Sequence, residues 1–124
     1  MGGDAGASAL LGRAGQRAAE DFLRRNGYEI AALNYRRARC EIDIIARRGG
    51  YTAFVEVKTL RSVIYGEPRE AVTLVKQKHI IRAAWAYVAE FEVQGDLRFD
   101  VVEVMVRDGE TRIVHIENAF QEGI

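Results

Sequence analysis

The chain has 124 residues, with 18 Lys and Arg against 18 Asp and Glu, so it has no formal net charge at pH 7. This length fits a single domain with its own hydrophobic core, and zero net charge argues against a strongly basic nucleic-acid binder. No apolar run approaches the 18 residues of a membrane span. The single cysteine excludes an internal disulfide and predicts a reducing, cytoplasmic setting.

The charges are unevenly distributed along the chain. Residues 13–82 hold 15 Lys and Arg against 8 Asp and Glu, whereas residues 83–124 hold 3 against 9. Such asymmetry can give a neutral protein a local phosphate-binding face. Solvated helix surfaces and loops account for the same pattern, so both interpretations stay open.

The first predicted element is a helix over residues 10–26, stopped by Gly27. Within this helix, Gly15 permits a close approach to a neighbouring element. A strand over residues 28–35 follows, and then two strands between about residues 41 and 58. Residues 1–9 are expected to be a flexible tail, residues 10–120 a single domain, and residues 121–124 a second tail.

A long amphipathic helix is predicted from Pro68 to Glu90, with Trp85 on its apolar stripe and therefore in the core. Strands over residues 97–107 and 111–116 follow, joined by an Asp-Gly turn. The order α-β-β-β-α-β-β predicts an α/β (α+β) fold, with a mixed sheet flanked by two helices, because the long helix joins its strands by a crossover.

Two of these strands place charges among apolar neighbours, at Cys40-Glu41-Ile42-Asp43-Ile44-Ile45 and at Phe54-Val55-Glu56-Val57-Lys58. The Gly49-Gly50 pair between them is a strong signal for a hairpin turn. Counting back from this turn puts Asp43 opposite Glu56 and Glu41 opposite Lys58. Because side chains alternate along a strand, all four are predicted to lie on one face.

The opposition of Asp43 and Glu56 suggests a metal site. Like charges directly opposed destabilise a hairpin unless a proton or a cation lies between them. Carboxylate oxygens suit Mg²⁺ or Mn²⁺, and Lys58 beside them can position an attacking water or stabilise charge on a phosphate. Cross-strand salt bridges are the structural alternative.

Blocks in the same order along nearly the whole chain resemble the YraN-like family of small bacterial proteins, which is similar to Holliday junction resolvases within the PD-(D/E)xK nuclease superfamily. The blocks are Gly12-Arg13-Ala14-Gly15, Gly27-Tyr28, Asn34-Tyr35-Arg36, Glu41-Ile42-Asp43-Ile44-Ile45, Phe54-Val55-Glu56-Val57-Lys58-Thr59, Gly66-Glu67-Pro68, Ala71-Val72, Lys76-Gln77, Ala83-Ala84, Arg98-Phe99-Asp100-Val101-Val102 and Asn118-Ala119-Phe120.

The resemblance implies a restriction-endonuclease-like core and a DNA endonuclease that uses Mg²⁺ or Mn²⁺. It assigns the two metal-binding carboxylates to Asp43 and Glu56, a further ligand to the Val57 backbone carbonyl, and the catalytic lysine to Lys58. Gln16 stands where the family usually has a glutamate on the first helix, which predicts weaker metal binding and catalysis. Glu20, one turn further along the same helix face, is a candidate substitute.

Other residues are secondary candidates. The nucleic-acid contacts predicted are Arg36, Arg37, Arg61, Lys76 and Gln77, with solvated loops as the alternative for the arginines. His79 and His115 have no Cys or His partner at zinc spacing.

Three functions therefore stay open. The first is a DNA nuclease, for which the resemblance suggests branched DNA as substrate and, by analogy, a homodimer. The second is a nucleic-acid-binding protein of nuclease descent, and the third is a protein-interaction domain.

Overall fold

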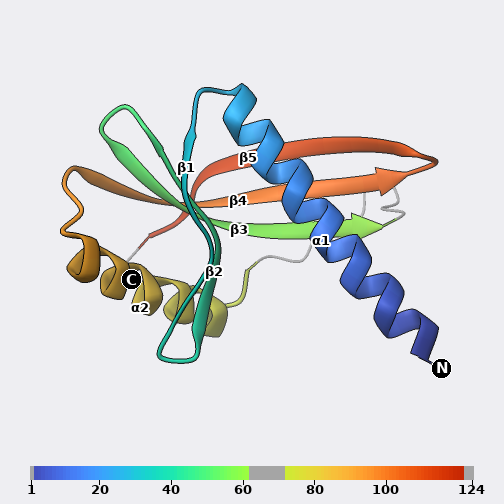
Figure 1. Ribbon diagram of the computed structural model, residues 1–124, viewed down its shortest axis with the longest axis horizontal. Coiled ribbons are helices and arrows are strands. Elements are labelled where there is room, and N and C mark those ends of the chain that lie inside the picture. The colour runs from blue at the N-terminus through green and yellow to red at the C-terminus, as the bar shows by residue number, and fades with distance from the viewer. Residues whose placement is uncertain (1, 62–71, 122–124) are drawn as a thin grey trace.

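The computed structural model describes the backbone of residues 2–61 and 72–121, and the side chains of residues 10–60 and 72–121. Two helices and five strands follow one another in the predicted order (Figure 1). They are α1 (Gly2–Arg25), β1 (Glu29–Arg37), β2 (Cys40–Arg48), β3 (Tyr51–Arg61), α2 (Leu74–Phe91), β4 (Asp96–Arg107) and β5 (Glu110–Phe120).

The strands form one mixed sheet in the order β1-β2-β3-β4-β5. β3 and β4 are parallel, and the other neighbouring strands are antiparallel. The parallel pair requires a crossover between its strands, and α2 lies within that connection. The predicted fold class, with its mixed sheet and two helices, is confirmed.

The two helices cover opposite faces of the sheet, and each buries its own core. On one face, α2 packs Ile80, Ala83, Ala84 and Tyr87 against strand residues that include Phe54. On the other face, α1 packs Ala19 and Leu23 against a second set of strand residues. The sheet is therefore the middle layer of three, and strand residues alternate between the two cores.

α1 is held close to the sheet at Gly15. A Cβ atom at this position would overlap the Thr59 hydroxyl of β3, so only glycine allows this approach. The close packing predicted for Gly15 is confirmed, and it brings the next residue, Gln16, next to Asp43 of β2.

Several element bounds differ from the prediction. α1 begins at Gly2 instead of residue 10, so helical backbone extends over most of the segment expected as a tail, and β5 continues to Phe120. α2 begins at Leu74, where the Thr73 side chain caps it by accepting a hydrogen bond from the Lys76 backbone amide. Pro68, the predicted start, lies outside the described residues.

The expectation that Trp85 is a core residue is wrong, because its side chain is 44% exposed. The apolar residues of α2 fall on two stripes, and the second one, with Leu74, Val75 and Trp85, faces outward. Periodicity alone does not say which of two apolar stripes meets the sheet. In the part of the chain described, neither helix has the length and apolar character needed to cross a membrane.

Candidate active site between the second and third strands

The β2–β3 hairpin has the predicted register over its closed part. Arg48 pairs with Tyr51 across Gly49-Gly50, and the pairs continue to Ile44 and Val55. The paired part of the two strands ends there. One residue further along β2, the Asp43 carboxylate accepts a hydrogen bond from the Val57 backbone amide at 2.8 Å. The Asp43 side chain therefore occupies the gap where the two strands part.

The predicted placement of four charged side chains on one face is wrong. In β2, Cys40, Ile42 and Ile45 belong to the core beneath α2, whereas Ile44 belongs to the core beneath α1. The alternation therefore reverses between Ile42 and Ile44, at Asp43, which is why counting back from the turn failed beyond this point.

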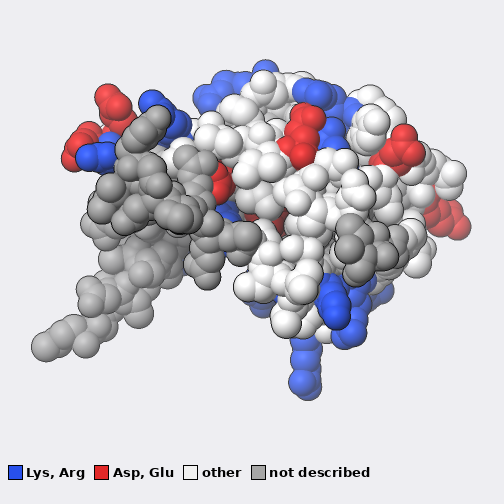
Figure 2. All heavy atoms as spheres, turned by 180° about the vertical axis from the view of Figure 1, so that it is seen from behind, with Lys and Arg blue, Asp and Glu red and all other residues white. Residues whose placement is uncertain are grey.

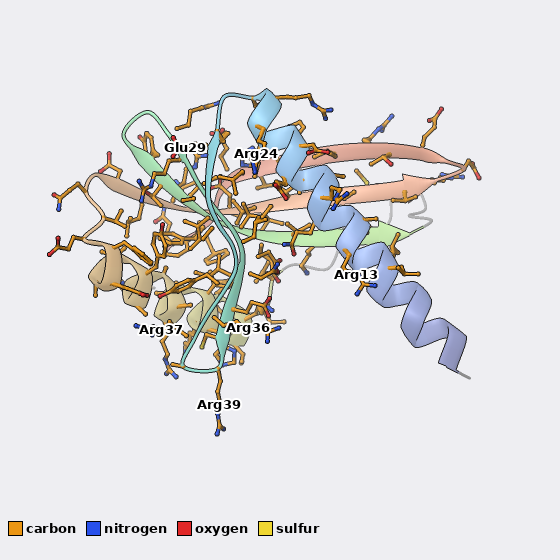
Figure 3. All side chains as sticks on the ribbon, viewed as in Figure 1. Arg13, Arg24, Glu29, Arg36, Arg37 and Arg39 are labelled. Carbon is orange, nitrogen blue, oxygen red and sulfur yellow. The ribbon has the colours of Figure 1, made fainter. Side chains whose placement is uncertain are left out.

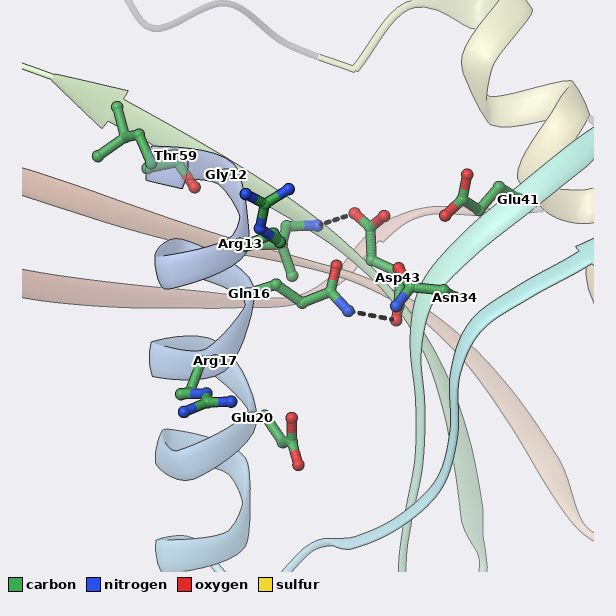
Figure 4. Close-up of a pocket in the computed structure, with 11 residues that line it drawn as sticks. Gly12, Arg13, Gln16, Arg17, Glu20, Asn34, Glu41, Asp43 and Thr59 are labelled. Carbon is green, nitrogen blue, oxygen red and sulfur yellow. Dashed lines mark hydrogen bonds between the residues drawn. The ribbon is translucent and has the colours of Figure 1, made fainter. Parts of the chain in front are cut away.

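Glu41 and Asp43 line a cleft of about 710 Å³ between α1 and the sheet (Figure 4). Glu41 is paired in register with Arg36 of β1 and forms an ion pair with it at 3.3 Å. Glu41 therefore pairs with Arg36 of β1, whereas both the predicted strand pairing and the salt-bridge alternative had placed Lys58 opposite it.

Gln16 lies in the same cleft, as its place on the first helix predicted. Its side-chain amide donates to the Asp43 backbone carbonyl at 3.5 Å (Figure 4). Glu20 also lines the cleft, but it is held by Arg24 at 2.8 Å. The position expected to carry a third acid therefore faces Asp43 with a neutral amide.

Glu56 is the electrostatically perturbed group of the site. Its side chain is buried, and this desolvation, together with the charge and hydrogen bond of Asp43, raises its pKa to about 7. Lys76 opposes the shift, because its Nζ lies 3.6 Å from Glu56 Oε2. The structure thus brings together Asp43, Glu56 and Lys76, the last of these predicted only as a nucleic-acid contact.

Lys58 lies on the α2 side of the sheet. It lines a second cavity of about 200 Å³ together with Gln77 of α2 and the buried Glu103. Glu103 is also the register partner of Lys58 on β4. Lys58 and Asp43 therefore line different cavities, on the two sides of the gap between β2 and β3.

The remaining predicted DNA contacts have varied surroundings. Arg36 holds Glu41, Arg37 lies 3.6 Å from Glu90, and the Arg61 side chain lies outside the described residues. The β1–β2 turn also presents Arg39 at its tip, where it projects from the molecule (Figure 3). Ala38 and Arg39 both have positive φ angles, 51° and 65°, a conformation that glycine usually supplies in such turns.

Three cleft residues were missed by the sequence reasoning. Arg13 and Arg17 lie one turn apart on α1 and line the cleft, and Asn34 lines it from β1 (Figure 4). The sequence could have indicated Arg13 and Arg17, because they are four residues apart and lie on the same helix face as Gln16 and Glu20. These two arginines add positive charge to the cleft that holds Asp43.

A buried polar network outside the site was also missed. Asp100, with no exposed surface, accepts bidentate hydrogen bonds from Arg98 at 2.8–3.1 Å and lies 2.7 Å from His115 Nε2. The Asn118 amide donates to it at 3.0 Å, and Arg98 also bonds the Tyr28 hydroxyl. These hydrogen bonds and charges lower the pKa of Asp100 despite burial, which raises it. His115 is therefore part of a structural network.

The donor set at the gap fits a hard divalent cation. Two carboxylates, Asp43 and Glu56, interact there, and the raised Glu56 pKa reflects burial and a neighbouring negative charge that Lys76 only partly offsets. The Val57 amide points to Asp43, and since the amide and carbonyl of a strand residue face the same edge, its carbonyl faces this gap too. No cluster of three or more His, Cys, Asp or Glu side chains suited to a metal occurs within residues 10–60 and 72–121.

The fold and this gap define a mixed α/β protein with a two-carboxylate site at the parting of two central strands. A model of the uncharacterised protein family UPF0102 matches residues 15–104, and the chain belongs to this family, the YraN-like proteins.

Its relatives match over most of their length. A UPF0102 protein of Symbiobacterium thermophilum is 48% identical over 115 residues, covering 91% of this chain and 98% of the relative. One of Chlorobium phaeobacteroides is 46% identical, covering 89% and 93%. One of Bacteroides thetaiotaomicron is 41% identical, covering 89% and 91%.

Proposed function

We propose that this protein is a metal-dependent, endonuclease-like protein that hydrolyses phosphodiester bonds of DNA. The observation that carries the proposal is the pair of interacting carboxylates, Asp43 and Glu56, in the gap between β2 and β3, with the Glu56 pKa raised to about 7. A buried acid whose pKa is shifted by a neighbouring charge, beside a cleft, is typical of functional sites.

Asp43, Glu56 and the Val57 carbonyl would hold Mg²⁺ or Mn²⁺. The bound ion would supply activation of a water and neutralisation of phosphate charge. The Val57 amide fixes the Asp43 carboxylate at 2.8 Å, so this ligand is oriented before a metal arrives. In this scheme Lys58 stabilises negative charge on the phosphate, and Lys76 balances the Glu56 charge.

The surroundings supply a path for a polyanion. Arg13 lines the cleft that holds Asp43 from α1. Arg36, near the end of β1, and Arg39, in the β1–β2 turn, stand apart from Arg13, close to that turn (Figure 3). Seen from behind, Lys and Arg side chains stand out along the upper and lower edges of the molecule, and the lower group ends in a projecting side chain (Figure 2). Positive charge on a neutral protein steers phosphate backbones to one region.

A second candidate function follows from Gln16. The neutral amide bonded to the Asp43 carbonyl replaces the acid expected on the first helix, which lowers the negative charge available to a metal. A nucleic-acid-binding protein with weak or lost catalysis is therefore the alternative. Preference for branched DNA, a homodimer that would cut two strands, and a cytoplasmic location are extensions of the proposal by analogy.

The test is a cleavage panel of branched, flapped and linear DNA with Mg²⁺ or Mn²⁺. We expect metal-dependent cleavage that is lost in Glu56→Ala and Lys58→Ala. Cleavage that survives both substitutions would come from a contaminating nuclease and would count against the proposal. Gln16→Glu decides between the two candidate functions. If the wild type does not cleave DNA but Gln16→Glu does, the result supports a nucleic-acid-binding protein that has lost the third acid of its site.

A further inference from the structure

The outward face of α2 presents an aromatic side chain beside two cations. Trp85 is 44% exposed, and Lys78 and Arg82 are exposed beside it. Their i, i+4, i+7 spacing places the three side chains on one ridge of the helix. The opposite side of α2, with Ile80, Ala84 and Tyr87, is the one that packs on the sheet.

The charge of this face has one sign. From Leu74 to Ala89 the helix contains Lys76, Lys78 and Arg82 and no acidic residue. Its only acid, Glu90, is at the far end of the helix, where Arg37 and the Tyr35 hydroxyl contact it. A large exposed aromatic group within such a surface indicates an interaction site, and the uniform charge indicates an anionic partner.

The candidate active site lies on the other side of this helix, the side that faces the sheet. Lys76, on the first turns of α2, reaches Glu56 at 3.6 Å. Trp85 lies nine residues further along, about 13 Å on the helix axis. Nine residues are two and a half helical turns, so Trp85 faces away from Lys76, and the surface of Trp85, Lys78 and Arg82 is separate from the candidate active site.

We propose that Trp85, Lys78 and Arg82 form a binding surface for single-stranded nucleic acid, in which one base stacks on the indole and the two cations hold neighbouring phosphates. Base stacking on exposed aromatic rings beside a basic track is how proteins bind unpaired strands without reading sequence. This inference rests on the proposed function for its class of partner and adds that the partner has an unpaired segment.

A second copy of the chain fits this face less well. In a two-fold dimer the same patch meets itself, so Lys78 and Arg82 of one copy would face their equivalents and repel them. A polyanion meets the same charges favourably.

The chain offers a direct probe, because Trp85 is its only tryptophan. Oligo(dT) and a blunt duplex of equal length are titrated into the full-length protein in EDTA, and Trp85 fluorescence is recorded. We expect saturable quenching by oligo(dT) and little by the duplex. Anisotropy of labelled oligo(dT) should show affinity weakened roughly 5- to 100-fold in Trp85→Ala and less in Trp85→Phe, which keeps a ring.

Phe91→Ala is the matched control, since Phe91 is a 53% exposed aromatic residue of the same helix beyond its basic stretch. It should leave the affinity for oligo(dT) unchanged, and circular dichroism should confirm that each variant is folded. Unchanged affinity in folded Trp85→Ala, or equal quenching by oligo(dT) and duplex, would overturn the inference. So would self-association that Trp85→Ala abolishes, because the occupant would then be a second copy.

These outcomes are separate from those of the proposed function. Binding to Trp85 in EDTA, without metal binding or cleavage in other assays, would remove only the nuclease proposal. Metal-dependent cleavage with an unresponsive Trp85 would remove only the present inference.

Discussion

Lys76 Nζ lies 3.6 Å from Glu56 Oε2, so a lysine of α2 supplies positive charge to the buried acid of the site. Local structure sets the positions of both side chains. The Thr73 cap fixes the start of α2 and so the place of Lys76, and β3 places Glu56 in the gap beside Asp43. The ion pair offsets part of the repulsion between the two carboxylates.

A divalent cation at this gap would compete with Lys76 for the Glu56 carboxylate. Lys76→Met is therefore expected to increase Mn²⁺ affinity roughly three- to tenfold, the size expected when about 1 kcal/mol of charge repulsion is removed. Isothermal titration at pH 8.5 measures the change. Lys78→Met, two residues further on the same helix, is the control and should change affinity little. Equal affinities of wild type and Lys76→Met would refute the competition.

The Glu56 pKa makes a prediction about stability and pH. A carboxyl with a folded pKa of about 7, against an ordinary value of 4.5, binds its proton more tightly in the folded state. Stability without metal should therefore fall as pH rises from about 4.5 to about 7. The loss at pH 8 is of the order of 1–3 kcal/mol.

Urea denaturation of Glu56→Gln in EDTA tests this dependence. The variant should be more stable than wild type at pH 8 and should lose most of the slope over this range, because an amide does not titrate. Exposed Glu110→Gln is the control. A wild-type stability that rises with pH between 5 and 7, with Glu56→Gln following it in parallel, would contradict the assignment.

Gly12 and Gly15 of α1 should respond in opposite ways to substitution by alanine. Gly12→Ala adds a Cβ with no atom within 4 Å, so helix propensity should stabilise the protein by about 1 kcal/mol. Gly15→Ala gains the same propensity but overlaps Thr59, and overpacking of this kind costs about 1–3 kcal/mol. Thermal unfolding of the two variants measures the contrast. A Gly15→Ala variant as stable as Gly12→Ala would show that α1 does not depend on this close contact.

The register of the hairpin could be predicted because Gly49-Gly50 fixes it and strand pairing propagates it residue by residue. The same counting failed at Asp43, where the alternation of Ile42 and Ile44 between the two cores reverses. The amino-acid composition does not indicate a local break of this kind. Because of the break, Glu41 forms its ion pair with Arg36 of β1. The presence of Gln16 beside Asp43 was predicted by family resemblance, since only the packing of α1 on β3 brings them together.

Trp85 and Asp100 show two further limits of the sequence. α2 has apolar residues on two stripes, and the choice between them depends on which one the sheet covers. The polar network of Asp100 draws on distant parts of the chain. Arg98, His115 and Asn118 contact Asp100 directly, and Arg98 also bonds the Tyr28 hydroxyl. Long-range polar contacts of this kind carry no periodicity.

Asp100→Asn is expected to destabilise the protein by about 3–5 kcal/mol. The substitution removes the charge that balances Arg98, whose side chain is only 11% exposed, and breaking one partner of a buried pair leaves the other uncompensated. Chemical denaturation measures the loss, with exposed Asp96→Asn as control. A loss below about 1 kcal/mol would show that water or Glu117, 3.8 Å from Arg98, replaces the missing charge.

The most direct test of the central claim is Mn²⁺ binding to wild type and Asp43→Asn by isothermal titration in the absence of DNA. If Asp43 and Glu56 hold a divalent cation, wild type should bind one Mn²⁺ per chain and Asp43→Asn should bind at least about tenfold more weakly, since a charged ligand is lost. Indistinguishable titrations of the two folded proteins, or no binding by wild type at millimolar metal, would contradict the metal site and the function proposed from it.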